Sequence, residues 1–443
     1  MLAYVFPGQG SQVPGMGAAL AGDYAIARET FDTADAALDF GLSALCFDGA
    51  AAELSRTENA QPAILATSVA AYRVLVQQTG CAPLVVAGHS LGEITAHVCA
   101  GSLDFGAALR LVRRRGELMQ AAVAPGEGAM VAVMGLSAAE VDEICVAAAQ
   151  SEIVAVANYN GAGQLVVSGQ GGAVARARQL ATEAGALTRA LDVSAPFHCA
   201  LMAPAAASLR AELVRTTFDS PRIPVVDGTS GRWDGGTGDP VELLSAQVCA
   251  PVRWDAVMDG LAAHGVRYVI EVGPGGRLTS MLRRAHRGIH TARFGEPADL
   301  EAVAGLLEDL PHLRRELGYW RHGPDGDLIA SDASEIVWAA TGVTEAVTDD
   351  GWTTRPDGSR MHRYGAMGVI DADGTLRRFD PAVWSPRADG AYVRADGTAL
   401  VHPGGGDHAL APEEWTVDAT GTMRRSDGSQ VIFADGDEWS FTG

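Results

Sequence analysis

The stretch VVAGHSLGEITAH, Val85 to His97, ends a hydrophobic run at Ser90, which has a glycine two residues to each side. Residues 84–87 are typical of a short buried strand, and the residues from Leu91 to about 100 are typical of a helix. A serine at this sharp turn exposes its hydroxyl above the helix N-terminus, and the glycines let the two elements approach. The stretch predicts an α/β enzyme with a nucleophilic serine; the alternative is a glycine-rich turn with an ordinary capping serine.

Length and composition predict a globular protein of two or three domains. The chain has 443 residues, of which 47% are apolar, and this supports a sizeable core. No apolar run approaches the ~18 residues that a membrane span needs. The first residues, MLAYVFPGQG, have no basic region before the apolar stretch and no cleavage site. We therefore expect a cytoplasmic protein without a membrane partner.

Charge and reactive side chains exclude several classes of function. The formal net charge of −21 argues against a nucleic-acid partner, because like charges repel. All 33 basic residues are arginines, which excludes a P-loop lysine and Schiff-base chemistry. Six cysteines without close spacing are interpreted as buried thiols rather than disulfides or a zinc site. These are Cys46, Cys81, Cys99, Cys145, Cys199 and Cys249.

Up to about residue 295, strand-like runs alternate with alanine-rich helical stretches, which indicates an α/β fold with a largely parallel sheet. The segment 126–195 has the order strand, helix, strand, strand, helix, strand, which predicts an inserted ferredoxin-like small subdomain. Residues 1–125 and 196–295 are expected to form an α/β-hydrolase-like core. The other predicted strands of the chain cover residues 2–6, 84–87, 223–227 and 268–272, and those of the insert include 130–134, 153–157 and 165–168.

A repeat fills the C-terminal part of the chain. Trp320, Trp352, Trp384 and Trp415 are spaced by 32, 32 and 31 residues and begin the phrases WRHGPDG, WTTRPDG, WSPRADG and WTVDATG. Asp-Gly, the favoured two-residue hairpin turn, recurs within the copies. Residues 319–443 are therefore expected to form an acidic β-hairpin repeat module, with 21 acidic and 10 basic residues, after a helical linker at 296–318. The tryptophans are interpreted as a core shared between copies, with a ligand-binding surface as the alternative.

One arginine stands out on the helix expected at 104–123. With about 100° per residue, Arg115 falls inside the apolar arc that contains Leu111, Leu118 and Met119. A buried arginine requires an anion, which is either an internal carboxylate or a substrate carboxylate held by the guanidinium fork. A charged head that extends to solvent is a further alternative.

A base for Ser90 is expected later in the chain, as in other α/β serine enzymes. His198, in LDVSAPFHCALM, lies where the chain should return from the insert to the main sheet. A histidine taken alone is more often a structural residue. His89 is next to Ser90, but its side chain is expected to point away from that of the serine.

Nine phrases together resemble the malonyl-CoA:acyl carrier protein transacylases, in order and with the right spacing. The resemblance covers about residues 1–295. The phrases are GQGSQ (8–12), QPAIL (61–65), GHSLGE (88–93), RRRGELMQ (113–120), GAM (128–130), NYNGAGQLVVSG (158–169), PFHCALM (196–202), QVCAPVRW (247–254) and EVGPG (271–275).

The resemblance implies a catalytic dyad. Ser90 is then the nucleophile that accepts the acyl group, and His198 is its general base. The main-chain carbonyl of Gln247 orients the histidine in place of an acid; Asp192, the nearest acidic candidate, is expected at the surface. The backbone amides of Gln9 and Leu91 are then expected to form the oxyanion hole.

The resemblance also implies which residues bind the substrate. Arg115 pairs with the free carboxylate of malonate, and Asn160 and Phe197 contribute to the substrate site. Phe197 before the histidine and Leu91 after the serine resemble malonyl-selecting enzymes. Because a bulky Phe197 leaves no room for an α-methyl group, malonyl is expected over methylmalonyl, with a discrimination of about 1–3 kcal/mol.

The implied reaction is ping-pong transfer of malonyl from malonyl-CoA through a malonyl-serine ester to the phosphopantetheine thiol of an acyl carrier protein. It needs no metal and no cofactor, and it supplies extender units for fatty acid or polyketide synthesis. Carrier proteins are acidic, so a basic docking patch is expected. The candidates are Arg113 and Arg114, and the run with Arg283, Arg284 and Arg287; an ordinary solvated arginine face is the alternative.

Two other functions are compatible with the sequence. A hydrolase that releases acyl groups from carrier proteins would use the same serine, but such relatives tend to lose the carboxylate anchor that Arg115 supplies. In the second, the transacylase part is a platform, and residues 319–443 bind a polyketide or fatty acid synthase or another partner.

Overall fold

The computed structural model describes residues 1–308 except positions 80, 125, 192, 194 and 234–237, together with the backbone of the strands beyond residue 308. The chain divides into two compact units, Met1–Glu308 and Asp309–Gly443. None of the described helices is long and apolar enough to cross a membrane.

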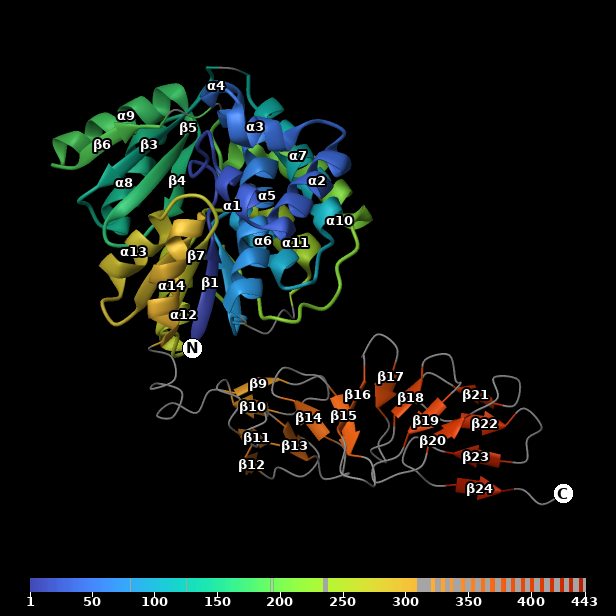
Figure 1. The fold of residues 1–443 in the computed structure, drawn as a ribbon. Helices are drawn as coiled ribbons and strands as arrows, with labels where there is room; N and C mark the ends of the chain where they lie inside the picture. Colours follow the sequence, from blue (N-terminus) through green and yellow to red (C-terminus); the bar gives the residue numbers. More distant parts are fainter. Residues whose placement is uncertain are drawn as a thin grey trace. The chain divides into compact units, whose positions relative to one another are not determined.

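The first unit alternates strands with helices (Figure 1). Its strands are β1 (Leu2–Phe6), β2 (Val85–Gly88), β3 (Gly128–Met134), β4 (Val154–Tyr159), β5 (Gln164–Gln170), β6 (Leu187–Ala190), β7 (Tyr268–Val272) and β8 (His290–Phe294). Its helices are α1 (Ala18–Asp23), α2 (Ala25–Leu38), α3 (Leu42–Asp48), α4 (Ala51–Ser55), α5 (Thr57–Thr79), α6 (Leu91–Cys99), α7 (Phe105–Ala121), α8 (Ala138–Ala149), α9 (Gly171–Glu183), α10 (Ala203–Arg215), α11 (Pro240–Gln247), α12 (Trp254–Ala263), α13 (Arg277–Ala285) and α14 (Leu300–Glu308), with short 3-10 turns at Ala200–Met202 and Pro297–Asp299.

The main sheet has the order β2-β1-β7-β8, and all its pairs are parallel. The expected α/β fold with a parallel sheet is confirmed. The central strand β1 is buried along its whole length, as expected for a parallel sheet with helices on both faces. Its side chains alternate: Val5 packs in the cluster that includes Trp254 of α12 and Leu282 of α13, whereas the rings of Tyr4 and Phe6 contact Tyr72 of α5.

One predicted strand of this sheet was wrong and another strand was missed. Residues 223–227 form no strand of their own; Val225 makes only an isolated parallel bridge to Val86. Pro224 lies within this segment and has no N–H to donate to a ladder of hydrogen bonds. Instead β8, which carries three polar residues in HTARF and so lacks a strand pattern, pairs with β7 as the edge strand.

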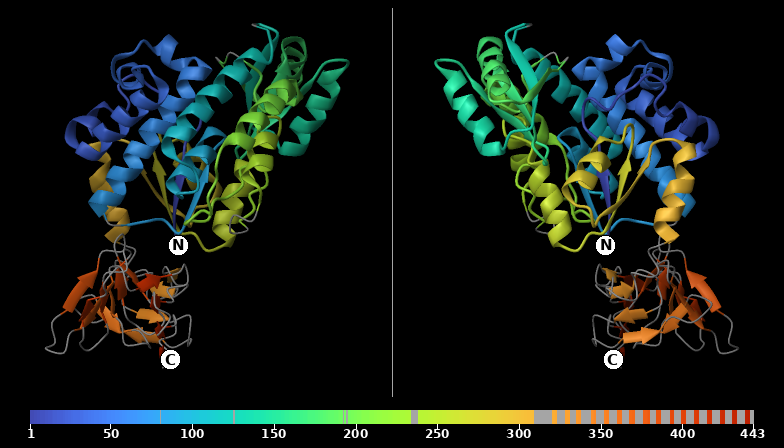
Figure 2. Two further views of the ribbon diagram at one scale, coloured as in Figure 1. Left: turned by 90° about the vertical axis from the view of Figure 1, so that its right-hand side faces the viewer. Right: turned by 90° about the vertical axis from the view of Figure 1, so that its left-hand side faces the viewer.

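The second sheet has the order β4-β5-β3-β6, and its pairs are antiparallel. The predicted chain order of strand, helix, strand, strand, helix, strand is confirmed. Val141 of α8 and Val174 of α9 pack with Val131 and Val167 of the strands in one core. Figures 1 and 2 show these two helices together on the same face of the sheet.

The second unit contains four sheets of four antiparallel strands each. Each sheet follows chain order, and its first strand begins at one of the four spaced tryptophan positions. The first sheet contains β9 (Trp320–His322), β10 (Leu328–Ala330), β11 (Glu335–Val337) and β12 (Thr344–Ala346); the second β13 (Trp352–Thr354), β14 (Arg360–His362), β15 (Met367–Ile370) and β16 (Leu376–Phe379); the third β17 (Trp384–Pro386), β18 (Tyr392–Arg394), β19 (Ala399–Val401) and β20 (Asp407–Ala409); the fourth β21 (Trp415–Val417), β22 (Met423–Arg425), β23 (Gln430–Ile432) and β24 (Glu438–Ser440). The predicted Asp-Gly turns at 373–374, 396–397, 427–428 and 435–436 lie outside the described residues, as does the part of the predicted helical linker after α14.

Candidate active site

Ser90 occupies a strained turn between β2 and α6. Its φ of 52° and ψ of −108° are unusual for a residue other than glycine. A Cβ on Gly88 would lie 1.9 Å from the backbone carbon of Gly92, and one on Gly92 would lie 2.0 Å from the carbonyl oxygen of Phe6. Only glycines fit at these two positions. Although Ser90 is the N-cap residue of α6, its side chain makes no capping hydrogen bond, so the ordinary capping serine is excluded.

The Ser90 hydroxyl contacts His198. Ser90 Oγ lies 2.8 Å from His198 Nε2, and the other ring nitrogen, Nδ1, faces the carbonyl oxygens of Gln247 at 3.0 Å and Ala250 at 3.2 Å. Because carbonyl oxygens only accept hydrogen bonds, Nδ1 carries the proton and Nε2 has the free lone pair. His198 Nε2 can therefore accept the proton of Ser90.

The surroundings of His198 keep its ring neutral. The side chain is buried, and burial lowers its pKa to about 3, with a further contribution from the positive charge of Arg115. No carboxylate contacts the ring among the described residues; the acidic candidate Asp192 lies outside them. The base is thus oriented by main-chain carbonyls of the last residue of α11 and of the segment that follows it.

Arg115 lies in the buried face of α7, as its place in the apolar arc predicted, with 2% of its surface exposed. A Cβ on Gly116 would lie 2.6 Å from the Cα of Glu58, so this glycine lets α7 approach α5 closely. The guanidinium donates to Gln61 Oε1 at 2.8 Å and Gln247 Oε1 at 3.0 Å. Both acceptors are neutral amide oxygens.

Arg115 also reaches the nucleophile. Its Nη2 donates to Ser90 Oγ at 3.2 Å, and its buried Nε has no hydrogen-bond partner in the described part of the chain. The internal acid that could have explained a buried arginine forms no salt bridge with it among the described residues. Burial lowers the pKa of Arg115 to about 10, so the group remains a cation near neutral pH, beside the nucleophile and without a directly paired anion.

Gln247 contacts Ser90, His198, Arg115 and Glu93. Besides its carbonyl bond to His198 and its Oε1 bond to Arg115, its Nε2 donates to Glu93 Oε2 at 2.6 Å and to the Ser90 carbonyl oxygen at 3.2 Å. The side chain of Gln247, like those of Gln61 and Glu93, was missed by reasoning from the sequence. The signal that could have found them was their place in the phrases that resemble the family: Gln61 is in QPAIL, Glu93 in GHSLGE and Gln247 in QVCAPVRW.

Two backbone amides lie at the predicted oxyanion hole. A Cβ on Gly8 would lie 2.4 Å from the carbonyl oxygen of His89, so the loop that carries Gln9 packs directly against the residue before Ser90. Neither the Gln9 N–H nor the Leu91 N–H has a hydrogen-bond acceptor among the described residues. Both are available to a ligand oxygen.

The other predicted substrate residues are buried near this turn. Asn160 is 6% exposed and its Oδ1 lies 3.1 Å from His89 Nε2, so the ring of His89 has a partner in the residue that follows β4. Phe197 is 7% exposed and directly precedes His198.

The predicted docking arginines differ in their partners. Arg113 pairs with Glu117 and lies over the ring of Phe40, and Arg114 pairs with Glu117 and Glu212. In the α13 region, the guanidinium of Arg283 contacts Ser280 and that of Arg284 contacts Gln164. Exposed Arg283, Arg284 and Arg287 form no ion pair among the described residues.

The cysteines and the acidic groups build no other reactive centre in the described part of the chain. All six cysteines are free thiols, and four of them are buried. The described residues contain no group of three or more potential ligands that could hold a metal ion.

A serine on a strained strand-to-helix turn, paired with a histidine that carbonyl groups orient, is the site of an α/β enzyme with a serine nucleophile. The chain belongs to the acyl transferase family, since the model of the acyl transferase domain matches residues 3–314. The resemblance to malonyl-CoA:acyl carrier protein transacylases is confirmed.

Two relatives from other bacteria are both named malonyl CoA-acyl carrier protein transacylase. The chain is 46% identical over 309 residues to the malonyl CoA-acyl carrier protein transacylase of Escherichia coli strain K12, a match that covers 69% of this chain and 98% of that protein. It is 39% identical over 310 residues to the enzyme of the same name from Bacillus subtilis strain 168, a match that covers 70% of this chain and 98% of that protein.

Solved structures agree with these relatives. An acyl carrier protein S-malonyltransferase from Vibrio cholerae matches with a TM-score of 0.65 and 44% identity over 68% of this chain and 99% of the other. A malonyl-transacylase in complex with its type II PKS acyl-carrier protein matches with a TM-score of 0.67 and 41% identity, over 70% of this chain and 99% of the other.

Proposed function

We propose that the chain is an [acyl-carrier-protein] S-malonyltransferase that moves malonyl from malonyl-CoA to the phosphopantetheine thiol of an acyl carrier protein. The observation that supports this best is the Arg115 cation, which is held by two neutral amides at 2.8 and 3.0 Å and lies 3.2 Å from Ser90 Oγ. A short acyl group on Ser90 with a free carboxylate at its far end would supply the anion that the site lacks.

The reaction follows from the roles of the site residues. Ser90 Oγ attacks the thioester carbonyl of malonyl-CoA while His198 Nε2 takes the hydroxyl proton. The N–H groups of Gln9 and Leu91 stabilise the negative oxygen of the tetrahedral intermediate. The carbon–sulfur bond then breaks, and His198 returns the proton to the coenzyme A thiolate.

The second half of the reaction reverses these steps with another thiol. The phosphopantetheine thiol of the carrier loses its proton to His198 and attacks the malonyl-serine ester. The ester bond breaks, Ser90 recovers its proton, and the malonyl-carrier leaves. The cycle is balanced with no metal and no cofactor, and the coenzyme A thioester substrate is consistent with the cytoplasmic location expected from the sequence.

Acyl choice rests on the surroundings of the bound group. Arg115 selects a carboxylate, and the buried Phe197 next to the base disfavours an α-methyl substituent, which supports malonyl over methylmalonyl. Asn160 contributes to the substrate site through a hydrogen bond between its side chain and His89, the residue before Ser90. The product supplies extender units for fatty acid or polyketide synthesis.

We assign the remaining parts as follows. Residues 1–125 and 196–295 form the α/β-hydrolase-like core, 126–195 the ferredoxin-like subdomain and 296–318 the linker; residues 319–443 form the hairpin repeat module. The order β4-β5-β3-β6 with two helices on one face supports the ferredoxin-like assignment. The repeat module is supported by the four sheets, each of which begins at one of the four spaced tryptophans.

The carrier protein would dock at Arg283, Arg284 and Arg287, because these exposed cations form no ion pair within the described part of the chain, whereas Arg113 and Arg114 pair with glutamates. The hydrolase alternative is disfavoured by Arg115, since a hydrolase of neutral acyl groups gains nothing from a buried cation beside the nucleophile. In the platform alternative, the repeat module binds a synthase or another partner.

Intact mass spectrometry tests the function. The protein is mixed with malonyl-, methylmalonyl- or acetyl-CoA, with and without a holo-carrier, and acyl-enzyme and acyl-carrier are followed. We expect malonyl on Ser90 and then on the carrier. Malonyl acquired by Ser90→Ala, or malonate released without carrier transfer, contradicts the proposal. Deletion of residues 319–443 that leaves transfer in solution unchanged but abolishes activity toward one partner supports the platform alternative.

A further inference from the structure

Glu93 is a buried carboxylic acid that the proposed reaction does not use. It lies in the first turn of α6, three residues after Ser90, and is 2% exposed. Its Oε2 accepts hydrogen bonds from Gln247 Nε2 at 2.6 Å and from the Gly228 N–H at 3.2 Å. A Cβ on Gly228 would lie 2.7 Å from this oxygen, so the segment after Val225 is shaped around the carboxyl group.

The bond to Glu93 decides which way the Gln247 amide points. Arg115 can only donate, so it requires the amide oxygen of Gln247 on its side. Glu93 Oε2 and the Ser90 carbonyl accept, so they require the amide NH₂ on theirs. Without an acceptor at position 93, the amide NH₂ keeps only the Ser90 carbonyl, at 3.2 Å, as its partner, and the Gln247 side chain is held less firmly.

Gln247 is also the residue whose main-chain carbonyl orients the base. Its O atom lies 3.0 Å from His198 Nδ1, and its Oε1 lies 3.0 Å from Arg115 Nη2. A shift of Gln247 therefore moves both the base and the carboxylate anchor. Errors of about 1 Å in such groups can lower rates by up to about 100-fold.

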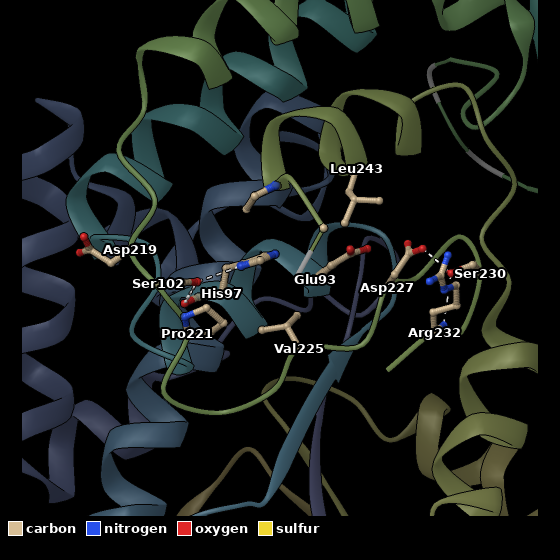
Figure 3. Close-up of a pocket in the computed structure, with 12 residues that line it drawn as sticks. Glu93, His97, Ser102, Asp219, Pro221, Val225, Asp227, Ser230, Arg232 and Leu243 are labelled. Atoms are coloured by element: carbon tan, nitrogen blue, oxygen red, sulfur yellow. Dashed lines mark hydrogen bonds between the residues drawn. The ribbon is translucent and has the colours of Figure 1, made fainter. Parts of the chain in front are cut away.

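Glu93 also lines a cavity that has no wall at Ser90. It has a volume of about 230 Å³, and Glu93, His97, Asp227 and Arg232 line it, whereas Ser90 does not. Figure 3 shows the carboxyl groups of Glu93 and Asp227 close together in its wall. Since Gln247 and Gly228 occupy Oε2, the Oε1 atom is the one on which Glu93 can carry a proton.

We infer that Glu93 is a positioning residue of the acyl-transfer site: its carboxyl group orients Gln247, and Gln247 in turn sets the base and the carboxylate anchor. Glu93 touches no reacting atom. This inference rests on the proposed function, because it assigns Glu93 a role in the same transfer reaction.

The protonated form of Glu93 suits this role. Burial raises its pKa to about 8, with a smaller contribution from Asp227, and the hydrogen bonds from Gln247 and Gly228 and the charge of Arg115 oppose the shift. The other titratable or charged groups that line the cavity are His97, Asp219, Asp227 and Arg232. His97 is neutral because burial lowers its pKa to about 4. A neutral Glu93 leaves the charge of Arg115 available to the substrate; an ionised Glu93 would compete for it.

Two variants separate the acceptor from the charge. Glu93→Gln keeps an oxygen for Gln247 and cannot ionise; Glu93→Met has similar volume and no strong acceptor. Glu271→Gln and Glu271→Met are the matched controls. Glu271 is a buried carboxylic acid that receives hydrogen bonds from Thr279, at the start of α13, and none from a site residue in the described part of the chain.

Three measurements on the full chain decide the inference: the rate of malonyl-enzyme formation from pH 6 to 9.5, the ratio of malonyl to acetyl loading, and the rate at which a fluorophosphonate labels Ser90. At pH 6.5 we expect Glu93→Gln to retain wild-type rates, and Glu93→Met to lose about 10- to 100-fold in malonyl loading, with slower labelling and a lower malonyl-to-acetyl ratio. Above about pH 8 the ratio should fall in the wild type and stay constant in Glu93→Gln.

The inference is overturned if folded Glu93→Met keeps both the labelling rate and the acyl ratio, or if the Glu271 variants change them equally. If Glu93→Met does not fold, the pH profile of Glu93→Gln decides, and a decline that matches the wild type overturns the inference. A wild type that never loads malonyl contradicts the proposed function instead, and the labelling rates still test the role of Glu93.

Discussion

Arg115 Nη2 lies 3.2 Å from Ser90 Oγ, so the buried cation and the nucleophile are direct neighbours. The two residues come from different helices, α7 and the start of α6. Because they are adjacent, an acyl group attached to Ser90 can reach the guanidinium only if its carboxylate is close to the ester. This relationship connects the chemistry of the serine to the choice of a short diacid.

Replacement of Arg115 should affect malonyl far more than acetyl. Arg115→Ala removes a charge-assisted pair with the substrate, which is worth about 1.5–3 kcal/mol, or about a 10- to 100-fold loss in the kcat/KM of malonyl loading. Acetyl loading should change little. Quenched-flow mass spectrometry of the acyl-enzyme measures both, with Arg110→Ala, an exposed change on the same helix, as control. Equal losses for the two acyl groups would refute a carboxylate role.

The acid limb of the pH profile should be absent near pH 6.5. Burial and the charge of Arg115 lower the pKa of His198 to about 3, so its basic form persists when the pH falls through the ordinary histidine range. We expect kcat/KM for malonyl loading to remain flat between pH 7 and 5. A half-loss of activity close to pH 6.5, in protein that circular dichroism shows to be folded, would contradict this environment for the base.

Gly92 should tolerate no side chain. A Cβ there would lie 2.0 Å from the carbonyl oxygen of Phe6, so Gly92→Ala must separate α6 from β1. We expect a loss of more than about 3 kcal/mol in the free energy of unfolding, since the clash is with backbone. Gly22→Ala is the control: nothing lies within 4 Å of its Cβ, and alanine in α1 should stabilise by about 0.5–1 kcal/mol. Urea titration measures both, and equal stabilities would disprove the close approach.

Charge reversal on α13 should weaken carrier recognition alone. In Arg283→Glu/Arg284→Glu, we expect the KM for the holo-carrier to rise about tenfold at low salt, because steering by the positive patch is lost. Loading from malonyl-CoA should be unchanged, since neither residue contacts the Ser90 site. Arg110→Glu, which reverses one charge at an exposed arginine of α7, is the control for charge reversal outside the patch. A double variant with a wild-type carrier KM would place the docking surface elsewhere.

Reasoning from the sequence found the residues that motifs and periodicity mark. The turn at Ser90 follows from a hydrophobic strand pattern, two glycines and a helical pattern, all of which are local. Arg115 was found because the helical period places it among apolar side chains. The strand at 223–227 was predicted wrongly and β8 was missed, because pairing partners decide whether a short segment is a strand.

The supporting side chains could not be found in this way. Gln61, Glu93 and Gln247 are ordinary polar residues in the sequence, and their roles depend on contacts over 54, 154 and 132 positions of the chain. Their phrases were recognised as similar to a family, but what each side chain touches was not contained in the phrases.

The sequence by itself predicted Ser90 as the nucleophile, and it determined the turn that carries Ser90, the burial of Arg115 and the family. These depend on local backbone geometry and on the period of a single helix. The resemblance already implied that the carbonyl of Gln247 orients His198. Only the tertiary structure decided that Arg115 has no directly paired anion beside Ser90 among the described residues, and that Glu93 supports both groups through the amide of Gln247. Hydrogen bonds between segments far apart in the chain depend on how the sheet and helices pack, and no local pattern records that packing.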